Sequence, residues 1–272
     1  MFSFGWFSSG RDRAALDLFT TFLDHLESGF IPARLAYVFS DRDPGETPAS
    51  DRFLAEVKHR GVPLITHSSR ELRRRITRRE PGLDAAREAF DAETIRRLKD
   101  FAVQVVVLAG YMLIVSPLLC RTLLLLNLHP AVPGGPKGTW QEVMWQIIAQ
   151  GQPEAGAMMH LATPELDEGP PVAYFRFPLT GPVFDPLWEA LGEKLKTRSL
   201  PEIQQTEGES EPLFARLRAE ELRREFPLIL LTLKNLAEDH IRLTHRGAAL
   251  EGRLIPQGLD LTPQVEEYLQ ES

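Results

Sequence analysis

Cysteine is almost absent from this sequence of 272 residues, in which Cys120 is the only one. A single thiol excludes an internal disulfide and fits a reducing compartment. The neighbouring leucines Leu118, Leu119 and Leu123 predict that Cys120 fills a hydrophobic core. We do not expect it to act as a nucleophile.

Basic residues are not in excess either, because the formal net charge is -7. This balance argues against a nucleic-acid binder dominated by phosphate contacts. The apolar residues 1–7 lack the basic flank and the length of a secretory signal. The apolar stretch 103–126 is interrupted at Gly110, Ser116, Pro117 and Arg121, and predicts two buried strands around a turn instead of a membrane span. We therefore expect a cytoplasmic protein.

Strand-like and helix-like segments alternate from the start of the chain, which is typical of a parallel sheet covered on both faces. The predicted fold class is α/β, with a Rossmann-like, doubly wound, mostly parallel sheet. The expected strands are 1–7, 33–39, 62–66, 103–109, 123–127, 155–162 and 171–177. The expected helices begin near Arg13 and Pro48 or cover 90–101, 140–149 and 213–237.

Three regions are expected along the chain. Residues 1–196 form a core, 197–212 are poor in apolar residues and predict a flexible excursion, and 213–272 form a C-terminal extension. The extension is expected to pack on the core as a long helix and a small hairpin that turns at Arg246-Gly247. The expected inner stripe of the long helix is Leu217, Leu222, Phe226 and Leu230.

A basic cluster occupies residues 70–79. A solvated helix and loop is the favoured interpretation, and a phosphate-binding patch is the alternative. The cluster consists of Arg70, Arg73, Arg74, Arg75, Arg78 and Arg79.

Three polar residues stand where ligands bind in α/β proteins. Asn127 and His129 end a buried strand, and alternation along that strand directs both to one face. An amide at such an edge can donate to a developing oxyanion, and an imidazole can add a second bond or move a proton. Asp167 lies in a loop with Gly169, and a carboxylate beside the imidazole would orient it. A satisfied turn and a loop-stabilising aspartate are the alternative interpretations.

Three blocks of sequence occur in a fixed order. They are Val107-Leu108-Ala109-Gly110-Tyr111-Met112-Leu113-Ile114-Val115-Ser116-Pro117, Asn127-Leu128-His129-Pro130 and Leu166-Asp167-Glu168-Gly169-Pro170. Together they closely resemble the phosphoribosylglycinamide formyltransferase family. The resemblance begins at Met1 and extends, more weakly, to Pro227.

The resemblance implies a formyltransferase fold that moves a formyl group from 10-formyltetrahydrofolate to a primary amine, without a metal. It implies that Asn127 binds the formyl oxygen, that His129 stabilises the tetrahedral intermediate and that Asp167 orients the histidine and relays a proton. His160 also matches a family position, as a support for the loop. The residues implied to bind the folate are Met112, Leu113, Ile114, Val115, Thr163 and Glu165.

The acceptor side departs from the family pattern. The family binds a substrate phosphate in a glycine-rich loop after the first strand, which corresponds here to Ser9, Gly10, Arg11, Asp12 and Arg13. The second glycine has become Asp12, and close approach of the backbone to a phosphate depends on glycine. Arg11 or Arg13 is a candidate to compensate by bidentate contact. The acceptor is expected to be glycinamide ribonucleotide or a similar phosphorylated amine, as in purine biosynthesis.

Several alternatives stay open at this stage. The amine could be another one, such as an amino sugar, or water could replace it, as in a 10-formyltetrahydrofolate hydrolase. The formyltransferase of initiator methionyl-tRNA shares the site but adds a larger tRNA-binding domain. A non-catalytic folate-binding module would be expected to have lost Asn127, His129 or Asp167. The expected partners are the folate and a small-molecule amine, with the protein a monomer or homodimer that binds neither nucleic acid nor membrane.

Overall fold

The computed structural model describes residues 1–165 and 167–271, so that Leu166 of the third block and the terminal Ser272 lie outside the described residues. The chain divides into two compact units. Within the described residues, no helix is both long and apolar enough to cross a bilayer. The first unit comprises Met1–Asn127, Leu161–Pro170 and Leu233–Leu254, and the second comprises Leu128–His160, Pro171–Thr232 and Ile255–Ser272.

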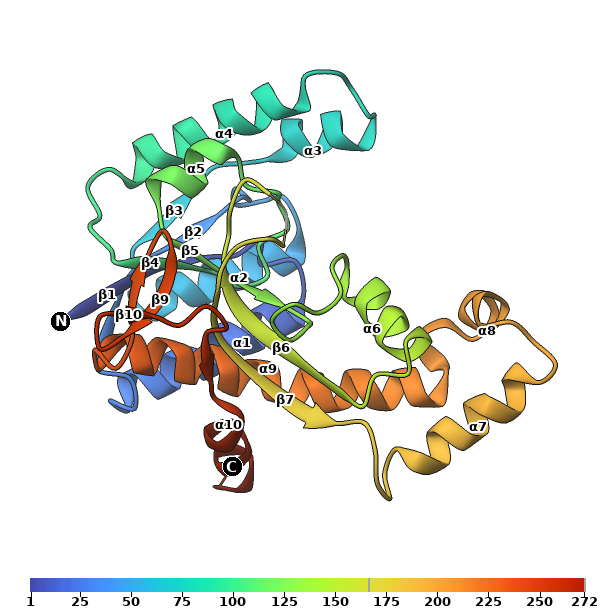
Figure 1. Cartoon of the computed structure of the whole chain (residues 1–272). Coiled ribbons are helices and arrows are strands. Elements are labelled where there is room, and N and C mark those ends of the chain that lie inside the picture. The colour runs from blue at the N-terminus through green and yellow to red at the C-terminus, as the bar shows by residue number, and fades with distance from the viewer. Residues whose placement is uncertain (166, 272) are drawn as a thin grey trace. The chain divides into compact units, whose positions relative to one another are not determined.

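Parallel strands form the centre of the first unit, in the order β5-β4-β1-β2-β3 (Figure 1). They are nearly continuous apolar runs, as expected for strands that are buried on both faces. The predicted mostly parallel α/β sheet is confirmed. The bounds are β1 (Phe2–Phe7), β2 (Ala33–Ser40), β3 (Leu64–Thr66), β4 (Val105–Leu108) and β5 (Leu125–His129).

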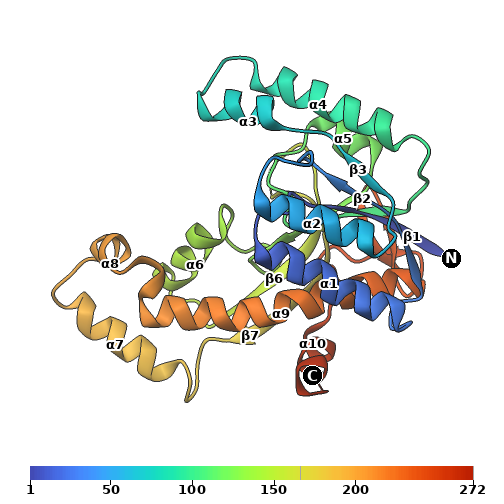
Figure 2. The ribbon, with the colours of Figure 1, turned by 180° about the vertical axis from the view of Figure 1, so that it is seen from behind.

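Helices cover both faces of these strands (Figures 1 and 2). Helices α1 and α2 pack side by side on one face, and α4 contacts α3 and α5 on the other. Helix α5 replaces the short turn expected between the strands of 103–126, because Ser116 caps it and Pro117 opens its first turn. The bounds are α1 (Arg13–Glu27), α2 (Pro48–His59), α3 (Arg70–Thr77), α4 (Leu83–Leu98) and α5 (Pro117–Thr122).

Local signals fix where these elements begin. Asp12 caps α1 by accepting the Ala15 N–H at 3.1 Å, and Thr47 caps α2 by accepting the Ser50 N–H at 3.1 Å. Both predicted helix starts are confirmed. Cys120 is buried in the core as predicted, and burial raises the pKa of its thiol to about 11.

The second unit combines a small sheet with helices. Strands β6 and β7 are antiparallel, and β11 pairs with β7 in parallel. The helix expected over 140–149 is confirmed as α6, and a capping box of Thr139 and Glu142 starts it. The bounds are β6 (Glu154–Leu161), β7 (Pro171–Pro178), β11 (Leu259–Asp260), α6 (Trp140–Ala149), α7 (Asp185–Leu195), α8 (Leu200–Thr206), η1 (Gly208–Ser210), α9 (Pro212–Ala237) and α10 (Thr262–Glu271).

The segment 197–212 is helical where a flexible excursion was expected. A capping box starts α8, since the Ser199 side chain accepts the Glu202 N–H while the Glu202 carboxylate accepts the Ser199 N–H at 2.7 Å. The Lys194 ammonium at the end of α7 lies 2.6 Å from the Glu207 carboxylate. A capping box and ion pairs therefore stabilise this segment. The low content of apolar residues gives no information about either.

The predicted hairpin near the C-terminus is confirmed in the first unit. Strands β8 (Arg242–Thr244) and β9 (Gly247–Leu250) are antiparallel, with Thr244 opposite Gly247 at the turn. The two-residue strand β10 (Arg253–Leu254) extends this sheet.

The buried face of α9 differs from the predicted stripe. Leu217 and Leu230 are buried, whereas the Leu222 side chain is 53% exposed. Leu222 follows Leu217 by five residues, which is about 140° around a helix, so the two cannot share a face. Glu221, four residues after Leu217, takes the inner position and is fully buried.

Replacement of Glu221 by glutamine should stabilise the protein at high pH. Burial raises the pKa of Glu221 well above its usual value, and the Glu225 charge adds to the effect. The unfolded chain therefore loses this proton at lower pH than the folded protein, and the stability contributed by Glu221 falls as pH rises between the two pKa values. We expect Glu221→Gln to gain about 1 kcal/mol at pH 8, or roughly 2–4 °C.

Thermal melts at pH 5 and pH 8 measure this effect. The gain should be larger at pH 8, whereas Glu193→Gln, at a position 71% exposed, should change neither melt. An equal or larger gain at pH 5 would contradict the prediction.

Candidate functional site

The carboxyl edge of the parallel strands brings together several loops of the first unit. Phe7 of β1 lies opposite both Phe39 of β2 and Leu108 of β4, and Leu108 lies opposite Asn127 of β5. The residues after these positions therefore leave the sheet at one edge, which is where ligands bind in open α/β sheets. The half-buried Asn127 stands at this edge, as its place at the end of a strand predicted.

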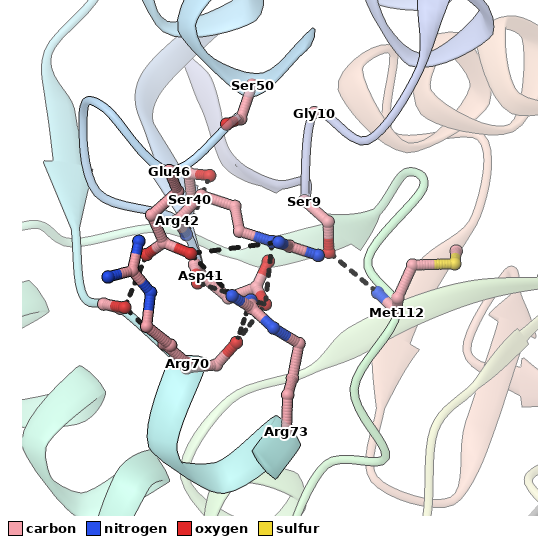
Figure 3. A network of polar contacts seen from close by, with 12 residues as sticks. Ser9, Gly10, Ser40, Asp41, Arg42, Glu46, Ser50, Arg70, Arg73 and Met112 are labelled. Carbon is pink, nitrogen blue, oxygen red and sulfur yellow. Dashed lines mark hydrogen bonds and ion pairs between the residues drawn. The ribbon is translucent and has the colours of Figure 1, made fainter. Parts of the chain in front are cut away.

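The loop after β1 is held by two hydrogen bonds of Ser9 to the loop after β4. The Ser9 N–H donates to the Gly110 carbonyl at 3.1 Å, and the Ser9 hydroxyl oxygen accepts the Met112 N–H at 3.1 Å (Figure 3). Gly10 has φ +54, and a Cβ there would lie 2.8 Å from the Phe53 side chain. Glycine is therefore required at position 10, and this loop is joined to the loop that follows β4.

The predicted folate-binding residues 112–115 lie in that second loop. Met112 and Ile114 are 50% and 51% exposed, whereas Leu113 and Val115 are partly buried against the core. Apolar side chains that are half exposed on a fixed loop present a surface to a planar ligand. The far end of the loop is anchored by Asp91, whose carboxylate accepts the Ser116 N–H at 2.6 Å.

Removal of the Asp91 carboxylate should loosen this loop. Burial raises the pKa of Asp91, although the hydrogen bond from Ser116 opposes the rise. Asp91→Ala leaves the buried Ser116 N–H without its acceptor, which costs about 1–3 kcal/mol. We expect the Kd for a folate to rise about tenfold, measured by fluorescence titration. Asp91→Asn keeps an acceptor oxygen and serves as the control, so equal damage by both changes would contradict this role.

The loop 161–170, which carries Asp167, closes on itself. The Leu161 N–H donates to the Pro170 carbonyl at 3.1 Å, and the Thr163 hydroxyl donates to the Glu165 carbonyl at 3.0 Å. Asp167 has φ +56, a left-handed conformation that aspartate adopts more readily than most residues. The backbone therefore makes a sharp, left-handed turn at Asp167.

A cavity of about 450 Å³ in the first unit includes one predicted folate-binding residue, Thr163. Its volume suits a small-molecule ring, and its walls are mainly apolar. The loop 112–115 and Glu165 are not among its lining residues. It is lined by Cys120, Arg121, Leu123, Leu124, Leu125, Leu161, Ala162, Thr163, Pro164 and His245.

His129 belongs to the second unit and is only 2% exposed. Its Nε2 lies 2.8 Å from the Pro136 carbonyl oxygen. Because a carbonyl oxygen only accepts, Nε2 carries the proton of this bond. The ring packs edge-on against His160, with the ring centroids 6.0 Å apart. The imidazole is thus oriented by its own loop, and the convergence of Asn127, His129 and Asp167 stays a prediction.

The arginines expected to compensate in the acceptor loop are engaged elsewhere. Arg11 is 62% exposed and pairs with Asp12, and Arg13 is 86% exposed and pairs with Asp17. Asp12 itself caps α1. These contacts lie at the start of α1 and do not direct either arginine toward a phosphate. A phosphate contact by Arg11 or Arg13 therefore stays a prediction.

The basic cluster 70–79 divides into two groups. Arg73 and Arg75 are half-buried; Arg73 pairs with Asp41 and Glu46, and Arg75 pairs with Glu80. The exposed members fit the predicted solvated helix. Those members are Arg70, Arg74, Arg78 and Arg79.

Asp41 and Arg42, directly after β2, also stand at this edge of the sheet, although none of the sequence motifs includes them. Both follow a predicted strand end, which is the signal that could have identified them. Among the described residues, no group of three or more histidine, cysteine, aspartate or glutamate side chains could hold a metal ion.

Comparison with known proteins identifies the family. The model of the formyl transferase family matches residues 14–180. Phosphoribosylglycinamide formyltransferase of Escherichia coli is 38% identical over 96 residues, which cover 35% of this chain but only 44% of that protein. The Haemophilus influenzae protein of the same name is 26% identical over 239 residues, covering 87% of this chain and 90% of that protein.

Solved structures agree with these matches. Glycinamide ribonucleotide transformylase 1 from Symbiobacterium toebii has a TM-score of 0.57 at 25% identity and covers 92% of this chain and 94% of that one. The family match spans more than half of the sequence, and the predicted resemblance is confirmed. This chain belongs to the formyl transferase family.

Proposed function

We propose that this protein transfers the formyl group of 10-formyltetrahydrofolate to the primary amine of glycinamide ribonucleotide or a similar phosphorylated amine. One observation carries the proposal. The amide of Asn127 stands at the carboxyl edge of the sheet, opposite Leu108, from which the apolar loop 112–115 departs. An amide donor at the sheet edge from which an apolar loop departs suits a formyl group carried by an aromatic donor.

In the proposed reaction the amine nitrogen attacks the formyl carbon and forms a tetrahedral intermediate. Asn127 donates its amide N–H to the developing oxyanion, and His129 provides a second stabilising contact. Asp167 takes part in moving the proton that the amine loses. The bond from the formyl carbon to N10 of the folate then breaks, and N10 gains a proton. Tetrahydrofolate leaves, and the formyl group stays bound to the acceptor nitrogen.

Donor consumption by the purified protein tests the proposal, with and without glycinamide ribonucleotide. We expect turnover that requires the acceptor and that Asp167→Asn lowers by orders of magnitude without loss of folate binding. Turnover without an amine would indicate a hydrolase. Folate binding without turnover would indicate another amine or a binding module. Either of these results would overturn the proposed acceptor.

A further inference from the structure

Arg42 is an unsatisfied guanidinium at the carboxyl edge of the sheet. It follows β2 by two residues, and its side chain is only 16% exposed. Its Nε is buried and has no hydrogen-bond partner among the described residues. The neighbouring carboxylates of Asp41 and Glu46 lie 3.9 and 3.8 Å away, too far for hydrogen bonds. The Nε–H donor of Arg42 is thus held without a close acceptor among the described residues.

Arg73 explains why these carboxylates do not satisfy Arg42. The Arg73 guanidinium lies 3.1 Å from the Asp41 carboxylate and 2.5 Å from that of Glu46. The hydroxyls of Ser69 and Ser68 donate to the same two carboxylates at 2.5 Å. Asp41 Oδ2 and both oxygens of Glu46 are therefore engaged by partners other than Arg42. The other Asp41 oxygen, Oδ1, is buried and has no hydrogen-bond partner among the described residues.

Charges of both signs lie around Arg42. Burial lowers the pKa of Arg42, and the positive charges of Arg73 and Arg11 lower it further, whereas the carboxylates of Asp41 and Glu46 raise it. Figure 3 shows the Arg42 guanidinium directed from the carboxylates toward Ser9, in the loop that also contains Gly10. Cations held close together with unsatisfied donors are stabilised by a bound anion.

We propose that Arg42 binds the phosphate monoester of the acceptor beside Ser9 and Gly10, and so selects phosphorylated amines. The inference rests on the proposed function for the identity of the acceptor. The planar guanidinium fork matches two phosphate oxygens, which a lysine ammonium cannot reproduce. In the family pattern a second glycine lets the backbone of the loop after β1 approach the phosphate. Here Arg42 contacts the phosphate instead.

Binding of inorganic phosphate tests the proposal without any catalytic assay. Phosphate should raise the melting temperature of the wild-type protein, and Arg42→Gln should abolish the shift. Arg42→Lys should retain at most a small shift. Arg96→Gln, an exposed arginine paired with Glu93, is the control that should keep the full shift. A phosphate shift that survives in Arg42→Gln would overturn the assignment even if the proposed reaction is correct.

Steady-state kinetics then identify the source of the anion. In Arg42→Gln we expect the KM for the phosphorylated acceptor to rise about 10–100-fold while the KM for the folate donor stays unchanged. A selective rise in the KM for the donor would mean that Arg42 binds the folate carboxylates, and would overturn the proposal. If the wild type transfers no formyl group, the proposed function fails, while the phosphate shift still decides the role of Arg42.

Discussion

His129→Ala should lower kcat of the proposed formyl transfer by about 10²–10⁴-fold. The imidazole is 2% exposed and is oriented by the bond of its Nε2 to the Pro136 carbonyl at 2.8 Å. A group held in this way contributes to the transition state without further reorganisation. In the proposed reaction the oriented imidazole stabilises the oxyanion, which forms only during formyl transfer. The measurement is kcat with saturating donor and acceptor.

Controls separate chemistry from folding in this experiment. The Kd for a folate should change little in His129→Ala, since the loop 112–115 and Thr163 are predicted to provide the folate contacts. His240→Ala removes a histidine that is 62% exposed and should leave kcat unchanged. A kcat for His129→Ala within threefold of the wild type would exclude His129 from the catalytic step.

Gly169→Ala should disrupt the loop that carries Asp167. A Cβ at position 169 would lie 1.6 Å from the Leu161 carbonyl oxygen, so the backbone itself must move. The displacement opposes the hydrogen bond from the Leu161 N–H to the Pro170 carbonyl. We expect a loss of about 2–3 kcal/mol in the free energy of unfolding. A fall in kcat/KM of about 10²-fold or more should accompany it, because misplacement of a catalytic group by 1 Å has an effect of this size.

Gly192→Ala is the matched control for this change. Gly192 lies inside α7, and no atom lies within 4 Å of the position of its Cβ. Alanine there should stabilise the protein by about 0.5–1 kcal/mol, since glycine is unfavourable in a helix interior. Chemical denaturation and steady-state kinetics of both variants measure the difference. If Gly169→Ala behaved like Gly192→Ala, the tight closure of the loop 161–170 would be wrong.

Local patterns in the sequence predicted much of the fold correctly. The helix caps at Asp12, Thr47 and Thr139 depend on residues three positions apart, so that they can be recognised from the sequence. Continuous apolar runs predicted strands that are buried on both faces. The end of one such run placed Asn127 at a strand end, and the order of the three blocks indicated the family.

In two segments the structure differs from what residue spacing and composition predict. Leu222 was placed on the inner face of α9 although five residues separate it from Leu217, and it is exposed. The segment 197–212 was expected to be flexible because it has few apolar residues. Its helix is stabilised by a capping box and by ion pairs to α7, which contribute without apolar burial.

The alternation of strands and helices, the helix starts and the family can be predicted from the sequence, because each depends on neighbouring residues or on their order. Which polar groups are satisfied depends on contacts between distant parts of the chain. Arg73 reaches Asp41 across 32 positions and leaves Arg42 unsatisfied, and Asp91 holds Ser116 across 25 positions. The need for glycine at position 169 likewise depends on a carbonyl oxygen eight residues away. Contacts of this kind form only when the chain folds back on itself, and no local pattern encodes them.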